Sequence, residues 1–343
     1  MADTRTPARK RINLALQGGG AHGAFTWGAL DRLLEDGRLE IVGICGTSAG
    51  AMNATALAYG LARGGPAEAR AVLARFWALV AERARFSPIQ PTPLDRLVSV
   101  GDMDFSPGWL FYDTLSRMVS PYVANPANYN PLAEVLDEII DFAWLRQHNK
   151  IQLFVCATNV KTGKIKVFGC NEISAAAVMA SACLPFLYQA VEVDGEHYWD
   201  GGFMGNPPIF PLIYETDCED VVIVQINPIA VDEVPMTAQA IVDRMNELSF
   251  NSSLMREMRA IAFVQKLLAE QRIPRGRYKD LKIHTIEAEE AMRRLGYSSK
   301  LNASGDFLQW LFELGRERAG AFLDAHYGKI GVESSTDIAK LFL

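Results

Sequence analysis

Short apolar runs alternate along most of the chain with stretches that carry the 3.6-residue periodicity of helices. Apolar runs of about four to eight residues between turn residues are typical of buried strands. The pattern predicts strands at residues 12–17, 41–46, 151–158, 165–169, 189–193, 196–200, 221–228 and 281–288. It predicts helices at residues 25–34, 49–62, 66–83, 237–271 and 306–326. Fully apolar strands separated by helices indicate an α/β protein with a largely parallel sheet, covered by helices on both faces.

Two segments depart from this alternation. The stretch VEVDGEHYW has Asp194-Gly195 at its centre, which predicts a β-hairpin. Residues 88–131 are rich in proline and aromatic residues and are interpreted as an inserted, cap-like segment. We therefore expect a basic N-terminal tail over residues 1–11 and a single domain over residues 12–343, with the insertion at about 88–131.

Composition narrows the class of protein. The 343 residues carry a formal net charge of −6, which argues against nucleic acid as a partner because such binding neutralises phosphates. The five cysteines include no C-x-x-C pair, which favours a reducing compartment over a disulfide framework or a zinc site. No secretory signal and no apolar run of about 20 residues is visible. We expect a cytoplasmic protein, with peripheral membrane contact as a further hypothesis; the oligomeric state is left open.

The stretch LALQGGGAHGAF places three glycines between a predicted strand and a predicted helix. Gly18, Gly20 and Gly23 satisfy the dinucleotide fingerprint, but the acidic residue expected at the end of the second strand is missing. A second hypothesis is that the amides of Gly19, Gly20 and Ala21 stabilise an oxyanion. A third is a tight turn without a ligand.

The second predicted strand ends in GTSAG, a G-x-S-x-G motif followed directly by a helix. The motif consists of Gly46, Thr47, Ser48, Ala49 and Gly50. A sharp turn of this kind exposes the serine, and the helix N-terminus places partial positive charge beside it. We interpret the serine as a nucleophile; the alternative is a serine that only serves the turn.

A serine nucleophile needs a base. The five histidines are His22, His148, His197, His284 and His326. The order Ser…Asp…His is available with either of the last two, but both lie within regular elements and are interpreted as structural. The stretch YWDGGF offers Asp200, followed by Gly201 and Gly202, as a carboxylate base in a dry site. Taken alone, the same residues are more typical of an Asp-Gly turn.

Taken together, GGGxxG, GTSAG and DGG, with ASACLPFLYQAVEVDGEHYWDGGF, resemble the patatin-like phospholipase family over residues 12–229. The resemblance implies a three-layer α/β/α patatin-like fold with a mostly parallel central sheet and an inserted cap-like helical segment. It implies a Ser-Asp dyad that hydrolyses lipid acyl esters without metal or cofactor. Ser48 matches the nucleophile and Asp200 the base; Gly18, Gly19, Gly20, Ala21 and Gly23 match the oxyanion loop.

One position departs from the family pattern, which usually has Arg or Lys where this chain has His22. A histidine would replace that charge only in part and in a pH-dependent way. Alternatives to a phospholipase A or lysophospholipase remain open: an acyltransferase or neutral-lipid esterase on the same dyad, or a non-catalytic lipid- or nucleotide-binding module. The aromatic stretch around Trp109 and Phe111 is interpreted as a cap helix packed on the core, or alternatively as a mobile lid.

Overall fold

One mixed sheet forms the centre of the protein, whose computed structural model describes residues 9–274 and 276–343. Its strands are β1 (Lys10–Leu16), β2 (Leu39–Thr47), β3 (Gln152–Asn159), β4 (Ile165–Phe168), β5 (Val191–Val193), β6 (Glu196–Asp200), β7 (Asp220–Val224) and β8 (Lys282–Ile286). The order is β5-β6-β3-β2-β1-β7-β8, with β4 paired to β3. The pairings among β1, β2, β3, β7 and β8 are parallel, whereas β4, β5 and β6 pair antiparallel. All eight predicted strands are confirmed.

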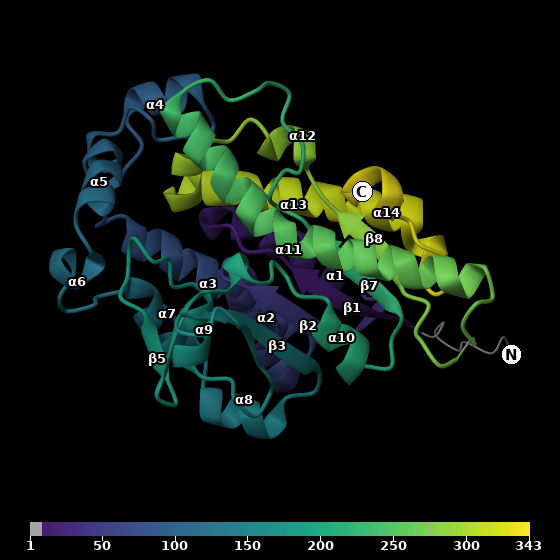
Figure 1. The fold of residues 1–343 in the computed structure, drawn as a ribbon. Helices are drawn as coiled ribbons and strands as arrows, with labels where there is room; N and C mark the ends of the chain where they lie inside the picture. The colour runs from purple at the N-terminus through teal and green to yellow at the C-terminus, as the bar shows by residue number, and fades with distance from the viewer. Residues whose placement is uncertain (1–8, 275) are drawn as a thin grey trace, which may run out of the picture.

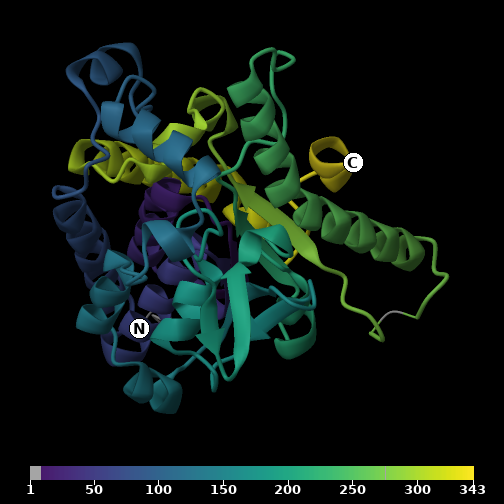
Figure 2. The ribbon, with the colours of Figure 1, turned by 60° about the vertical axis from the view of Figure 1, so that its left-hand side comes forward.

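Helices cover both faces of the sheet (Figures 1 and 2). Successive side chains of a strand point to opposite faces, so Leu14 and Leu16 enter one core and Ala15 the other. The first core is completed by α1 (Gly23–Asp36), α2 (Ala49–Gly64), α3 (Pro66–Ala84), α9 (Ala175–Ser181) and α13 (Gly305–His326). The second is completed by α10 (Phe210–Glu215), α11 (Ala238–Ala269) and α14 (Ile338–Phe342). The predicted three-layer α/β/α arrangement is confirmed.

The proline-rich segment is a series of short helices. They are α4 (Pro93–Val98), α5 (Pro107–Met118) and α6 (Pro121–Ala124), followed by α7 (Pro131–Ile139) and α8 (Phe142–His148). In α4 to α7 a proline occupies the first turn, directly after a Ser, Thr or Asn whose side chain accepts a backbone amide. Four of the seven prolines in residues 88–131 are therefore helix starts.

The ends and boundaries of the domain are described in part. The predicted tail at residues 1–11 lies mostly outside the described residues, and β1 begins at Lys10, two residues before the predicted strand. The single-domain organisation stays a prediction. Among the described residues, no helix is long and apolar enough to cross a membrane.

The predicted hairpin is confirmed between β5 and β6. Asp194 and Gly195 both have positive φ, 52° and 80°, as a type I′ turn requires. The hairpin returns the chain into β6, which runs antiparallel to β3 and ends at Asp200. This turn therefore delivers the candidate base to the sheet.

Helices α1 and α13 approach each other closely. A Cβ on Gly28 of α1 would overlap the carbonyl oxygen of Phe312, and one on Gly315 of α13 would overlap that of Phe25. Only glycine allows this backbone approach. The helix that follows the glycine loop is thus fixed against the C-terminal part of the chain.

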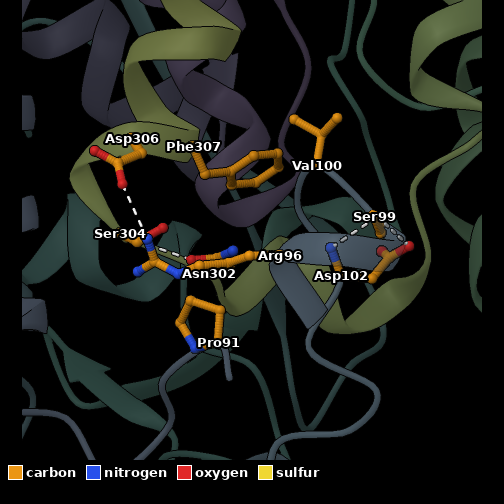
Figure 3. Close-up of a pocket in the computed structure, with 9 residues that line it drawn as sticks. All are labelled: Pro91, Arg96, Ser99, Val100, Asp102, Asn302, Ser304, Asp306 and Phe307. Carbon is orange, nitrogen blue, oxygen red and sulfur yellow. Dashed lines mark hydrogen bonds and ion pairs between the residues drawn. The ribbon is translucent and has the colours of Figure 1, made fainter. Parts of the chain in front are cut away.

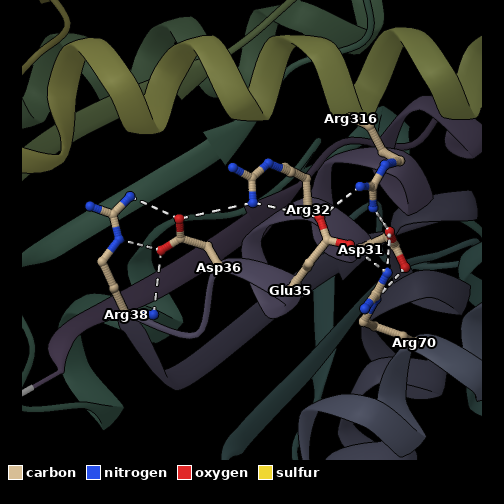
Figure 4. Close-up of polar contacts among 7 residues, drawn as sticks. All are labelled: Asp31, Arg32, Glu35, Asp36, Arg38, Arg70 and Arg316. Carbon is tan, nitrogen blue, oxygen red and sulfur yellow. Dashed lines mark hydrogen bonds and ion pairs between the residues drawn. The ribbon is translucent and has the colours of Figure 1, made fainter. Parts of the chain in front are cut away.

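Ion pairs add to this contact (Figure 4). Asp31 of α1 accepts hydrogen bonds from Arg70 of α3, at 2.7 Å, and from Arg316 of α13. Glu35, one turn further along α1, accepts from the same two arginines at 3.0 and 2.7 Å. The network is extended along α1 by Arg32, Asp36 and Arg38. Because two carboxylates share two arginines, the network holds α1, α3 and α13 together better than an isolated surface pair does.

Candidate active site

Ser48 occupies a sharp turn between β2 and α2. Its backbone has φ 55° and ψ −124°, a strained conformation for a residue with a side chain. A Cβ on Gly46 would overlap the carbonyl oxygen of Gly50, and one on Gly50 would overlap that of Leu16. Both glycines of the G-x-S-x-G motif are thus required by the backbone packing of the turn.

Hydrogen bonds fix this turn from both sides. The Ser48 amide donates to Oγ of Ser181 at 2.9 Å, and Oγ1 of Thr47 donates to the carbonyl oxygen of Gly205 at 2.6 Å. Ala49 lies on the other side of the turn, where its Cβ is 2.6 Å from the position that a Cβ on Gly23 would take. The turn is therefore held by α9 and by the segment after β6, and it packs against the start of α1.

Strand β3 lies between Ser48 and Asp200. Thr47, directly before Ser48, pairs with Cys156 on one edge of β3, and Asp200 pairs with Ala157 on the other edge. Neighbouring strands are about 4.8 Å apart, so two side chains at the end of β3 can meet across it. Gly201 permits the crossing, because a Cβ there would overlap the carbonyl oxygen of Cys156.

The carboxylate of Asp200 is fully buried. Its Oδ1 accepts the amide of Gly202 at 2.7 Å, while Oδ2 has no hydrogen-bond partner among the described residues. Burial raises the pKa of Asp200 to about 6, and the Gly202 amide and the nearby Ser48 hydroxyl oppose that shift. The side chain is a carboxylate near neutral pH with one oxygen available for a proton.

The glycine loop lies directly against the serine. A Cβ on Gly18 would be 2.6 Å from Cβ of Ser48, and Gly20 has a positive φ of 60°. Within residues 9–274 and 276–343, the amides of Gly19, Gly20 and Ala21 have no hydrogen-bond acceptor. These three N–H groups are therefore not used by the hydrogen bonds of the described residues.

Two glycines of the predicted oxyanion loop, Gly18 and Gly23, do not offer free amides. The amide of Gly18 donates to Oδ1 of Asn206 at 2.7 Å, and the amide of Gly23 bonds to the carbonyl oxygens of Gly20 and Ala21. Neither amide is free for a ligand. Gly18 and Gly23 instead permit the close packing of the loop on Ser48 and Ala49.

Polar side chains that the sequence analysis did not single out hold the glycine loop in place. Oε1 of Gln17 accepts the amides of Ile226 and Asn227, both at 2.9 Å, and Nδ2 of Asn227 donates to the carbonyl oxygen of Gly18 at 2.7 Å. These bonds explain why β7 ends at Val224, although the apolar pattern predicted a strand to residue 228. The chain leaves the sheet there to support the loop.

Helix α11 packs on the segment that carries Asp200. The ring of Phe250 occupies the space that a Cβ on Gly202 would need, and Oγ of Ser253 accepts the amide of Asn206 at 3.1 Å. Glu257, one turn further, accepts the amides of Ile209 and Phe210 at 2.7 and 2.9 Å. Helix α11, predicted from the sequence as a long helix, therefore fixes the position of the segment that follows Asp200.

The histidines do not form a triad with Ser48. His284 bonds to Asp220 at 3.0 Å and to Ser335 at 2.9 Å from the interior of β8, and His326 packs on Phe322 at the end of α13. Nε2 of His22 bonds to Oγ of Ser299 at 2.7 Å. Among the described residues no histidine is hydrogen-bonded to Ser48, which agrees with the structural interpretation of His284 and His326.

A small hollow lies elsewhere in the structure (Figure 3). It has a volume of about 120 Å³ between α4 and the start of α13, with Arg96, Asp306 and Phe307 among its lining residues. It contains none of the residues around Ser48. In the part of the chain that the structure describes, no group of three His, Cys, Asp or Glu residues is placed to hold a metal ion.

Comparisons with solved structures give distant matches. VipD from Legionella pneumophila is 16% identical, with a TM-score of 0.42 over 95% of this chain and 72% of that one. The heterodimeric ExoU–SpcU complex from the type III secretion system of Pseudomonas aeruginosa gives 17% identity, with a TM-score of 0.38 over 95% of this chain and 53% of the other. This chain therefore spans only about half the length of the second match.

Sequence comparisons give a clearer result. A search of curated proteins found no match. The family model described as "Patatin-like phospholipase" matches residues 14–213, more than half of the chain and the part that contains the glycine loop, Ser48 and Asp200. The chain belongs to the patatin-like phospholipase family.

Proposed function

We propose that this chain is a serine acyl hydrolase that cleaves lipid acyl esters with Ser48 as nucleophile and Asp200 as base. The observation that carries the proposal is the buried carboxylate of Asp200, across the end of β3 from Ser48, with Oδ2 unpaired among the described residues. A carboxylate that has lost water on all sides is a stronger base than one in solvent. The family match adds support for a lipid substrate.

The reaction proceeds in two halves. Oγ of Ser48 forms a bond to the acyl carbon while Oδ2 of Asp200 takes the hydroxyl proton. The carbonyl oxygen becomes an oxyanion, which accepts hydrogen bonds from the amides of Gly19, Gly20 and Ala21. When the intermediate collapses, the ester bond breaks and Asp200 returns the proton to the leaving alcohol.

Water completes the cycle. Asp200 takes a proton from a water molecule, whose oxygen attacks the acyl-serine. A second oxyanion forms at the same amides, and its collapse releases the fatty acid and returns the proton to Ser48. The same carboxylate therefore serves as base and acid in both halves.

A fluorophosphonate probe, which reacts with activated serines, tests the proposal. We expect the wild type to be labelled and to release fatty acid from phospholipid, and Ser48→Ala to do neither. Asp200→Asn should lose turnover and remain folded, whereas Asp137→Asn, at an exposed position on α7, should behave as wild type. An unlabelled wild type would overturn the proposal and favour a non-catalytic lipid- or nucleotide-binding module.

We also propose that the protein acts in the cytoplasm and contacts membranes peripherally. Several large apolar side chains of the insertion are exposed, among them Phe111 at 69% and Met118 at 79%. Trp109, in contrast, is buried and packs on Tyr297 with 6.0 Å between ring centroids. This contrast supports a helix with one face fixed to the protein and the other available to lipid.

A further inference from the structure

The glycine loop lacks a positive charge of its own. His22 is buried, and its Nε2 is 2.7 Å from Oγ of Ser299. That hydroxyl donates its hydrogen to the carbonyl oxygen of Gly296 at 2.6 Å, so it accepts from His22, whose proton is therefore on Nε2. Burial, together with the charge of Lys300, lowers the pKa of His22 to about 3. The imidazole is neutral at working pH.

A lysine from the C-terminal part of the chain lies against the same loop. Lys300 belongs to the short 3-10 helix Tyr297–Leu301, and its carbonyl oxygen occupies the space that a Cβ on Gly20 would need. Its Nζ donates to Oδ1 of Asn227 at 3.0 Å. That oxygen is 3.7 Å from the position that a Cβ on Gly19 would take, so the side chain of Asn227 contacts both the ammonium group and the backbone of the glycine loop.

The ammonium group of Lys300 has no carboxylate within ion-pair distance among the described residues. Burial lowers the pKa of Lys300, and the charges of Glu247 and Asp243 on α11 each oppose that shift by a smaller amount. A partly buried cation without a paired anion is costly. A cation that is linked to the glycine loop through Asn227, and whose charge acts on His22 of that loop, is suited to a negative charge that appears only during a reaction.

We infer that Lys300 is the positioning residue of the oxyanion loop, supplying the positive charge that His22 does not. It acts through Asn227, whose Nδ2 donates to the carbonyl oxygen of Gly18 at 2.7 Å and so fixes the direction of the amides that follow. Its charge also favours the oxyanion over the neutral ester, so it lowers the barrier more than it strengthens substrate binding. This inference rests on the proposed function of Ser48 and Asp200.

The test compares Lys300→Met, Lys300→Arg and wild type in phospholipid hydrolysis and in the rate of fluorophosphonate labelling. We expect Lys300→Met to lower kcat and the labelling rate by roughly 10- to 100-fold, with KM changed by less than about 3-fold. Lys300→Arg keeps the charge and should recover most of the loss. Lys266→Met, which removes an exposed lysine of α11, should match wild type.

Two further measurements separate a charge from a packing role. The wild type should lose kcat at alkaline pH as Lys300 loses its proton, and Lys300→Met should lack that alkaline limb. Thermal unfolding of Lys300→Met should occur at the wild-type temperature or above, because an unpaired ammonium group is removed. Lower thermal stability with an unchanged pH profile would show a packing role and overturn the inference.

The outcomes also distinguish the two proposals. If the wild type reacts with the probe and Lys300→Met reacts equally fast, the inference is overturned, while the proposed roles of Ser48 and Asp200 are unaffected. An unreactive wild type would overturn the proposed function and this inference with it.

Discussion

Asp200 faces Ser48 across the end of a single strand, β3, and keeps one carboxylate oxygen unpaired among the described residues. The other oxygen is held by the amide of Gly202, so the carboxylate cannot rotate freely. Burial, which raises the pKa of Asp200 to about 6, makes the group a useful base near neutral pH. The packing at the end of β3 therefore determines both where the Asp200 carboxylate lies and how basic it is.

This pKa predicts the acid side of the pH profile. Because the base must be unprotonated, kcat/KM should rise with pH and level off above an apparent pKa near 6. The check is kcat/KM between pH 4.5 and 8 with an uncharged ester, whose own ionisation cannot contribute. A plateau that already begins near pH 4 would contradict a buried Asp200 as the base.

The same shift predicts an effect on stability. The folded state holds the proton of Asp200 up to about pH 6, whereas the unfolded chain loses it near 3.8. The contribution of this residue to folding therefore falls as pH rises between these values, and the penalty is complete above them. We expect Asp200→Asn to raise the free energy of unfolding at pH 8 by roughly 2–3 kcal/mol, measured by urea denaturation. At pH 3, below both values, the gain should disappear.

Asn206 is predicted to matter for the rate and little for binding. Its Oδ1 accepts a hydrogen bond from the amide of Gly18 at 2.7 Å, and its own amide donates to Oγ of Ser253 at 3.1 Å. Asn206→Ala should loosen the loop beside Ser48 and lower kcat by roughly 10- to 100-fold, with KM nearly unchanged. Steady-state kinetics provide the measurement, and Asn171→Ala, at an exposed position, is the control. A loss confined to KM would place Asn206 in substrate binding.

Local patterns in the sequence located the turn at Ser48 and the carboxylate of Asp200, the proposed nucleophile and base. The strained turn at Ser48 needs glycines at fixed spacing, and Asp200 is followed by glycines because Cys156 and Phe250 approach their backbones. Apolar runs likewise predicted the eight described strands, most clearly β1, β3 and β7, which are buried over most of their length. These steric and burial requirements act on residues that are close together in the chain, so they produce recognisable local sequence patterns.

The support of the site was not predictable in this way. Gly18 and Asn206 are 188 residues apart, and Gln17 and Asn227 are separated by 210. Gln17, Asn206 and Asn227 are ordinary polar residues in loops, and only the assembled fold shows which side chain accepts which amide. The same holds for Lys300, which lies outside the segment that the family model matches. Tertiary hydrogen bonds of this kind have no periodicity or spacing to reveal them.

Gly28 tests the contact between α1 and α13. A methyl group there would overlap the carbonyl oxygen of Phe312, so Gly28→Ala must push the helices apart. We expect a loss of about 1–3 kcal/mol in the free energy of unfolding, despite the higher helix propensity of alanine. Chemical denaturation is the measurement. The control Gly305→Ala, at the start of α13 with open space around it, should be neutral or stabilising.

The exposed side chains of α5 provide a test of membrane contact. Phe111 and Met118 are largely exposed, whereas Trp109 on the same helix is buried against Tyr297. Burial of one such side chain in lipid stabilises the bound state by about 1.5–3 kcal/mol. The double variant Phe111→Ala/Met118→Ala should therefore bind liposomes at least about tenfold more weakly in co-sedimentation, with unchanged thermal stability.

Trp109→Ala should have the opposite profile, with lower thermal stability and a smaller effect on liposome binding, because its ring packs within the protein. Phe263→Ala removes a side chain that is 61% exposed on α11 and controls for the general effect of losing an exposed aromatic residue. If the double variant and Phe263→Ala pellet with liposomes as well as wild type, α5 does not contact the membrane. The exposed apolar side chains of α5 would then have to be explained by another partner.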